Sequence, residues 1–103
     1  MTFFKGETKL ITIYYTDSDD DVVDMSAYTF ALRAKESDQQ ATAEITVADS
    51  FFNKTNAATG EIVLTFAASA SYDVKTYLCQ ISATNGVITD LSGIFMIEIL
   101  EPI

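Results

Sequence analysis

The chain of 103 residues contains no histidine, no tryptophan, one cysteine and one proline. Without histidine it lacks the usual general base of nucleophilic catalysis and the commonest metal ligand, so an enzyme or a zinc protein is a poor expectation. The single cysteine, Cys79, excludes an internal disulfide. Cys79 falls within an alternating apolar run, and we therefore expect a buried, unreactive thiol rather than a nucleophile.

Basic residues are also scarce, because six Lys and Arg stand against fifteen Asp and Glu, for a net charge of −9. No basic cluster is present to neutralise phosphates, so we expect no nucleic-acid partner and no membrane partner. No apolar run approaches the roughly 20 residues of a membrane span. Residues 1–9 lack the basic and apolar regions of a signal peptide. We expect a soluble chain made in the cytosol, folded as one domain over residues 1–103.

What the chain does contain is a period-two alternation of apolar and polar residues. This alternation predicts strands at 9–16, 28–35, 43–48, 61–66, 74–83 and 86–100. Ser92-Gly93 is expected to interrupt the last run with a bulge or kink. Asn85-Gly86 predicts a two-residue type I′ hairpin turn, whereas 36–42 is expected to form a turn or loop and 51–60 an irregular segment. The fold class is therefore all-β, an antiparallel sandwich of about seven strands, with a barrel as the main alternative.

An acidic cluster lies between the first two predicted strands. Asp17, Asp19 and Asp21 have the spacing of the first ligands of a calcium-binding loop. Val22 and Tyr28 stand where such a loop requires its turning glycine and its closing bidentate glutamate. We therefore expect no cofactor and a solvated turn in which the aspartates bond local backbone. A weak calcium contact at the three aspartates remains an open alternative.

Two pairs of adjacent phenylalanines, Phe3-Phe4 and Phe51-Phe52, lie outside the clearest strands. Neighbours on a strand point to opposite faces, so each pair can place only one ring in the core. The other ring is expected to lie under a loop or against another subunit. Phe3, Phe4, Phe51 and Phe52 are accordingly the interface candidates, the first pair on a terminal arm that is free to reach a neighbour. Apolar residues make up 49% of this short chain, which favours some apolar surface facing a partner.

The segment DVKTYLC, residues 73–79, looks like the strand F signature of immunoglobulin domains, in which a tyrosine stands two residues before a cysteine. In that interpretation the Tyr77 hydroxyl bonds upstream backbone and Cys79 points inward. The chain has no second cysteine and no tryptophan, so the likeness concerns topology rather than the antibody class. A chance match in an aromatic strand is the other open explanation.

The order of several weak motifs carries a wider resemblance. The motifs are Gly6-Glu7-Thr8, Asp17-Ser18-Asp19, Val23-Asp24-Met25, residues 33–35, Thr59-Gly60, Tyr77 to Ile81, and Leu91-Ser92-Gly93. In this order they resemble the small immunoglobulin-like domains of tailed-bacteriophage structural proteins, and they are similar to the N-terminal domain of baseplate upper proteins. The resemblance spans almost the whole chain, although the family's first turn often has glycine where this chain has Asp20 or Asp21.

The resemblance implies an immunoglobulin-like β-sandwich that serves as a non-catalytic virion structural protein of a tail, baseplate or related assembly. Its implied partners are other virion proteins and, because phage tails repeat their parts in rings, further copies of itself as a homo-oligomer. The implied location is the virion, after synthesis in the host bacterial cytoplasm. The competing hypothesis is a ligand-binding or adhesion module that takes a host glycan or depends on calcium. An enzyme comes third, because no spacing singles out a catalytic carboxylate pair.

Overall fold

A computed structural model describes residues 1–36 and 42–103. The strands are β1 (Thr2–Phe4), β2 (Thr8–Tyr14), β3 (Thr29–Lys35), β4 (Ile45–Val47), β5 (Phe52–Asn53), β6 (Glu61–Ala67), β7 (Thr76–Thr84), β8 (Thr89–Leu91) and β9 (Phe95–Leu100), with the 3-10 turns η1 (Asp49–Phe51) and η2 (Ala57–Thr59). In the described part of the chain, no helix is long and apolar enough to span a bilayer.

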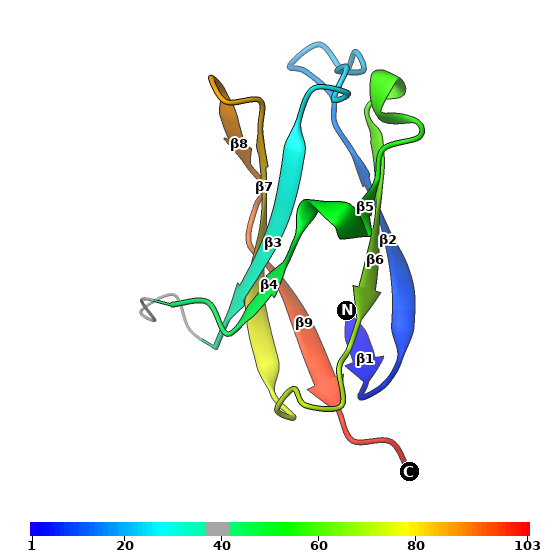
Figure 1. Cartoon of the computed structure of the whole chain (residues 1–103), viewed down its shortest axis with the longest axis vertical. Coiled ribbons are helices and arrows are strands. Elements are labelled where there is room, and N and C mark those ends of the chain that lie inside the picture. Colours follow the sequence, from blue (N-terminus) through cyan, green and yellow to red (C-terminus); the bar gives the residue numbers. More distant parts are fainter. Residues whose placement is uncertain (37–41) are drawn as a thin grey trace.

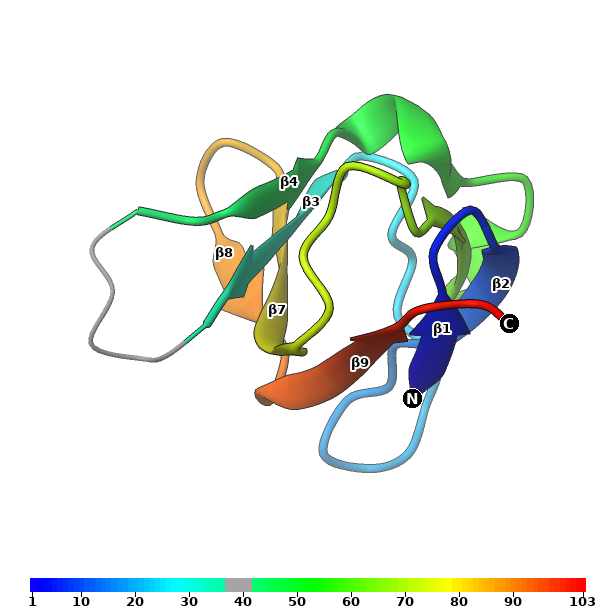
Figure 2. The same cartoon turned by 90° about the horizontal axis from the view of Figure 1, so that it is seen from below.

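The strands form two sheets that face each other (Figure 1). The larger sheet has the order β1-β9-β7-β3-β4, and β8 also pairs with β7, whereas the smaller sheet has the order β2-β6-β5. β1 and β9 run parallel, and the other strand pairs in these sheets are antiparallel. Figure 2 shows β2 on the far side of the molecule from β3 and β7. The predicted all-β sandwich is thus confirmed, while its immunoglobulin-like topology stays a prediction.

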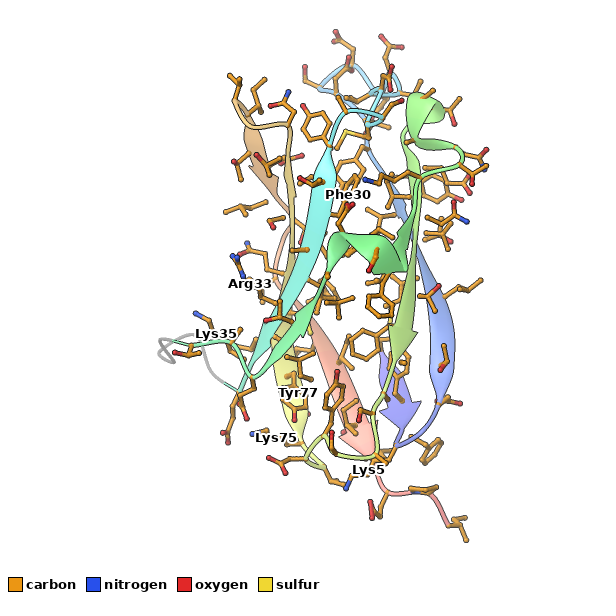
Figure 3. The ribbon with its side chains drawn as sticks, in the orientation of Figure 1. Lys5, Phe30, Arg33, Lys35, Lys75 and Tyr77 are labelled. Carbon is orange, nitrogen blue, oxygen red and sulfur yellow. The ribbon has the colours of Figure 1, made fainter. Side chains whose placement is uncertain are left out.

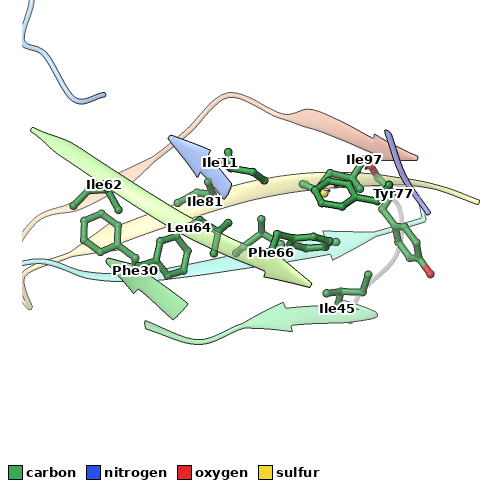
Figure 4. Close-up of a cluster of buried hydrophobic side chains, with 14 of the residues drawn as sticks. Ile11, Phe30, Ile45, Ile62, Leu64, Phe66, Tyr77, Ile81 and Ile97 are labelled. Carbon is green, nitrogen blue, oxygen red and sulfur yellow. Dashed lines mark hydrogen bonds between the residues drawn. The ribbon is translucent and has the colours of Figure 1, made fainter. Parts of the chain in front are cut away.

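Alternate side chains of both sheets meet in one core, because each strand turns every second residue inward. Figure 4 shows side chains from β6 meeting those of β3, β7 and β9 between the layers. Two aromatic contacts join the sheets directly: Phe3 packs on Phe66 with ring centroids 4.9 Å apart, and Phe30 stacks on Phe52 at 5.5 Å. The described buried residues are all apolar or weakly polar, so burial of apolar surface is the main stabilising term of the fold.

Most predicted strands agree with observed ones to within two residues, which is the ordinary uncertainty of strand ends. The predicted interruption of the last run at Ser92-Gly93 is also confirmed, since β8 ends at Leu91 and β9 begins at Phe95. Ser92 keeps the chain hydrogen-bonded to β7 across this interruption. Its N–H donates to the Ile81 carbonyl and its hydroxyl accepts from the Ile81 N–H, both at 2.9 Å.

The predicted type I′ turn at Asn85-Gly86 is wrong. Thr84 pairs with Thr89, so the loop runs over residues 85–88. Gly86 has the positive φ of +93°, whereas Asn85 has no positive φ, although a type I′ turn needs one at both positions. The Asn85 side-chain oxygen accepts the N–H groups of the two residues after Gly86, at 2.9 and 2.7 Å, and this local bonding closes the longer loop.

The free N-terminal arm predicted for Phe3-Phe4 is also wrong, because this segment is strand β1. Phe3 pairs with Ile99 of β9, and the Glu98 N–H donates to the Met1 carbonyl at 2.8 Å. The segment 51–60 likewise contains β5, a two-residue strand paired with β6, where an irregular course was predicted. The predicted loop at 36–42 lies largely outside the described residues.

Candidate functional site

Each phenylalanine pair divides between interior and solvent. Phe3 and Phe4 do so by alternation along β1, whereas Phe51 ends η1 and Phe52 begins β5. Phe3 and Phe52 are 0% and 4% exposed, whereas Phe4 and Phe51 are 43% and 52% exposed. Phe3 and Phe52 are therefore core residues that hold the two sheets together. The interface prediction is corrected for these two residues and stays a prediction for Phe4 and Phe51.

The acidic cluster forms a short hairpin, here called the acidic hairpin (residues 16–22), whose ends join in a β-bridge. The Asp17 carboxylate accepts the N–H groups of Asp19 and Asp21 at 2.8 and 3.1 Å, and the Asp17 N–H donates to the Asp21 carbonyl at 2.9 Å. Asp20 adopts the left-handed conformation with φ of 62°, which aspartate tolerates better than most residues. The predicted turn with aspartate bonded to local backbone is confirmed.

The same hairpin brings three carboxylates together. Asp17, Asp19 and Asp21 each place one carboxylate oxygen within 4.8 Å of the others, and all three residues are exposed. Oxygen ligands of this kind suit Ca²⁺, but Ca²⁺ takes six to eight of them, and Val22 and Tyr28 supply neither the turn nor the closing ligand of the usual loop. The hairpin can offer a cation at most part of its coordination shell, so the calcium site stays a prediction.

A second surface lies on the solvent side of the larger sheet, here called the outer face (Arg33, Lys35, Leu78, Gln80, Ile94 and Met96). Strand pairing sets Leu78 between Lys35 and Met96, and sets Gln80 beside Arg33. Ile94 and Met96 are 63% and 58% exposed. Figure 3 shows Arg33 and Lys35 projecting from β3 away from the interior. The outer face therefore combines exposed apolar side chains with two cations.

The outer face is hollowed on both sides of β3. One hollow of about 300 Å³ is lined by Arg33, Lys35, Leu78, Gln80 and Ile94. Another of about 400 Å³ is lined by Arg33 and Lys35 with Thr42, Ala43 and Thr46. The same two cations border both hollows, so any group that enters either one meets positive charge.

Arg33 and Lys35 differ from the other basic residues in having no carboxylate partner among residues 1–36 and 42–103. Each remaining lysine lies within 4.0 Å of a carboxylate: Lys5 of Glu101, Lys9 of Glu7, Lys54 of Asp49, and Lys75 of Glu36, Glu44 and Asp73. Within the described part of this chain of net charge −9, the outer face is therefore where cations form no ion pair.

A different ionic group ties the two sheets together. Lys54, next to β5, donates to both Asp49 carboxylate oxygens at 3.0 and 2.9 Å and to the Tyr28 carbonyl at 3.1 Å. Asp49 in turn accepts the N–H of Phe30 at 2.8 Å. Partial burial raises the pKa of the Asp49 carboxyl, but the hydrogen bonds from Lys54 and Phe30 outweigh it and hold the pKa below its usual value. These contacts give the group a structural role.

We expect Asp49→Asn to lower the free energy of unfolding by about 1 kcal/mol at neutral pH, a figure that allows for the screening of a partly exposed pair. Because the folded pKa of Asp49 is depressed, its contribution is complete above the unfolded pKa of about 4 and is lost as the pH falls through the folded value. Urea unfolding of the wild type and of Asp49→Asn at pH 7 and at about pH 3 measures the contribution of Asp49 to the free energy of unfolding.

The difference between wild type and Asp49→Asn should therefore shrink at the lower pH. An equal difference at both values would contradict the ionic account. The control is Asp20→Asn, since the Asp20 carboxylate forms no ion pair with any described residue. We expect that control to change the free energy of unfolding by less than about 0.5 kcal/mol.

Tyr77 and Cys79 lie where the strand F likeness places them. The Tyr77 hydroxyl donates a long hydrogen bond of 3.4 Å to the Asp73 carbonyl, and the residue is 2% exposed. Cys79 is 1% exposed, and burial raises the pKa of its thiol to about 11. The thiol is therefore protonated at neutral pH and shielded from solvent, which confirms the prediction of a buried cysteine.

Sequence reasoning predicted a strand at 28–35, which contains Arg33 and Lys35, but it missed the apolar neighbours of these cations. Leu78 and Met96 come from β7 and β9, and only the pairing register places them beside Lys35. The outward phase of each strand was readable from its own alternation. The order of the strands in the sheet was not, so the combined surface could not be assembled from the sequence.

Comparison with known proteins returned no match to a family model, and no significant match to a curated protein or a solved structure. The bacteriophage resemblance therefore depends on the order of motifs in the sequence alone. The observations that bear on function are the outer face and the acidic hairpin.

Proposed function

We propose that this chain is a non-catalytic structural protein of a tailed-bacteriophage virion, a tail or baseplate module that docks onto other virion proteins through the outer face. The observation that supports the proposal is the juxtaposition of exposed Ile94 and Met96 with Arg33 and Lys35, two cations that form no ion pair with a described residue. Contiguous exposed apolar side chains on a folded domain favour a contact surface. The motif order supports the virion setting.

The composition of the outer face suits contact between proteins. The backbone of β3, β7 and β9 is already paired within the sheet, so recognition falls to side chains. Methionine adapts its shape to a partner, and arginine is enriched at interface centres. Charges beside the apolar residues steer encounter and exclude partners of the wrong sign. Among the described residues, those that line the hollows of the outer face are cationic, apolar or small polar side chains, and such side chains suit contact between proteins.

The proposal is tested on particles released from the cells that encode the chain. Mass spectrometry and immunogold electron microscopy of purified particles should find the wild-type chain at a constant copy number. We expect Met96→Glu to reduce its incorporation at least about tenfold, because the substitution places an unpaired charge in the contact.

The matched control is Leu10→Glu, which introduces the same charge at an exposed position, 69% accessible, on the solvent side of the smaller sheet. Both variants are exposed, so circular dichroism and melting curves should show them folded. Absence of the wild-type chain from particles would overturn the virion role. Equal incorporation of the two variants would overturn docking through the outer face.

A second candidate function is a ligand-binding or adhesion module that depends on calcium or takes a host glycan. The observation that favours it is the group of carboxylate oxygens of Asp17, Asp19 and Asp21 within 4.8 Å of one another. Specific binding to the folded state raises the melting temperature with ligand concentration. A rise with millimolar Ca²⁺ or with host polysaccharide that is absent from Asp19→Asn would favour this function, whereas flat responses favour assembly.

A further inference from the structure

We propose that copies of this chain associate head to tail, with the acidic hairpin of one copy seated on the outer face of the next, against Arg33 and Lys35. The inference rests on the proposed function, because it names an occupant of the docking surface. Its first support is charge complementarity. Arg33 and Lys35 lack carboxylate partners, and the carboxylates of Asp19, Asp20 and Asp21 accept no hydrogen bond, in each case among the described residues.

The apolar parts of the two surfaces also match. Val22, at the base of the acidic hairpin, is 62% exposed, and Ile94 on the outer face is 63% exposed. Ile94 lines the same hollow of about 300 Å³ as Arg33 and Lys35. Each surface therefore presents an apolar side chain beside charge, and seating one on the other removes apolar area from water while pairing opposite charges.

The acidic hairpin is already ordered before any contact forms. Its ends are joined by a β-bridge, and the Asp17 carboxylate fixes the two N–H groups of the turn. The carboxylates of Asp19, Asp20 and Asp21 thus remain available on a shaped backbone. A preorganised segment loses little conformational entropy on binding, which favours the hairpin over an unstructured acidic segment as the occupant.

The net charge of the chain favours one of the three possible contacts between two copies, which are hairpin with hairpin, outer face with outer face, and hairpin with outer face. Two copies at −9 each repel at long range. A symmetric contact of hairpin with hairpin adds to this repulsion, as does a contact of outer face with outer face. The contact of hairpin with outer face instead brings the excess acid of one copy to Arg33 and Lys35 of the next.

The positions of the two surfaces make such a contact repeat. The connection between β2 and β3, which contains the acidic hairpin, lies at the end of the sandwich opposite the C-terminus (Figure 1), whereas Arg33 and Lys35 lie along its flank (Figure 3). In a bound pair, one copy therefore keeps an unused hairpin and the other keeps an unused outer face, so further copies can add at both ends. Heterologous contacts of this kind generate closed rings or open filaments.

Sedimentation velocity over a concentration series tests the inference on two charge-reversed variants. One is Arg33→Glu/Lys35→Glu, with an acidic outer face, and the other is Asp19→Lys/Asp21→Lys, in which two lysines balance the remaining Asp17 and Asp20 and the hairpin loses its net charge. Each variant thereby loses the attraction between its own two surfaces, so we expect self-association at least about tenfold weaker than that of the wild type. An equimolar mixture again offers an unchanged acidic hairpin, from the first variant, to an unchanged outer face, from the second, and should associate again.

Three results overturn the inference: a wild-type chain that stays monomeric at every concentration, association unchanged in both variants, or a mixture as weak as its components. Melting curves check folding, and Arg33→Glu alone, at an exposed position, replaces the double variant if that one unfolds. A monomeric wild type that is still incorporated into particles would reject head-to-tail association and leave docking onto other virion proteins intact. Absence from particles would reject the proposed function itself.

Discussion

Replacing Gly60 with alanine is expected to lower the free energy of unfolding by about 3 kcal/mol or more. Gly60 has φ of +80°, and an added Cβ would lie 2.5 Å from the Tyr15 carbonyl oxygen and 3.1 Å from the Val23 carbonyl oxygen. Both neighbours are backbone atoms. Neither carbonyl can move away easily, because hydrogen bonds hold the three segments together. The Tyr15 N–H donates to the Gly60 carbonyl at 2.9 Å, and the Val23 N–H donates to the Tyr15 carbonyl at 3.1 Å. The left-handed strain and the close contact therefore add.

Two other glycines supply graded controls for this result. Gly86 shares the positive φ, at +93°, but an added Cβ would meet no atom within 4 Å, so Gly86→Ala is expected to cost about 1 kcal/mol. Gly93 has neither the positive φ nor a close neighbour, so Gly93→Ala should change stability by less than about 0.5 kcal/mol. Urea unfolding of the three variants measures the series. Equal losses at Gly60 and Gly86 would show that conformation, not close approach, sets the effect.

Phe3→Ala is expected to destabilise the fold by about 3–4 kcal/mol, whereas Phe4→Ala, one residue along the same strand, should cost less than about 1 kcal/mol. Phe3 is 0% exposed, and its ring packs on Phe66 at 4.9 Å, with the Lys9 ammonium 5.1 Å from its centroid. Removing the ring leaves a cavity between the sheets, while the Phe4 ring is already 43% exposed. A loss near 3 kcal/mol is a large part of the 5–15 kcal/mol that holds a domain folded.

Chemical unfolding gives the two free energies, and amide hydrogen exchange locates the damage. The Glu98 N–H donates to the Met1 carbonyl at 2.8 Å, so we expect its exchange to accelerate in Phe3→Ala and to change little in Phe4→Ala. Similar losses in the two variants would contradict the division of this pair between core and surface. The same comparison can be made at Phe52, 4% exposed, and Phe51, 52% exposed.

The elements that were predicted well are those whose pattern is local. β3, β6 and β7 each extend over at least seven residues, and over that length a period of two distinguishes a strand without knowledge of its neighbours. β1 and β5 have three and two residues, too few to show a period. β1 also pairs with β9 at the other end of the chain, and no local signal announces such a partner.

The turns and the candidate surfaces also divide into features that depend on residues nearby in the sequence, which were predictable, and features that depend on distant residues, which were not. The bonding of Asp17 to the backbone of its own turn was predictable, because it involves residues two and four positions away. The loop at Asn85 was mistaken because the Asn85 side chain closes a longer loop than the Asn-Gly pair suggests. The outer face depends on which strands lie together, since Lys35, Leu78 and Met96 become neighbours only across three paired strands.

The parallel pairing of β1 with β9 determines how the domain responds to mechanical force. Tension applied before Thr2 and after Leu100 pulls the two strands lengthwise in opposite directions. The registered pairs Thr2 with Glu98, Phe3 with Ile99 and Phe4 with Leu100 are then sheared together rather than opened one after another. Force along the chain is then resisted by several backbone hydrogen bonds at once. The two terminal strands of the domain therefore share the load at the points where the polypeptide enters and leaves it.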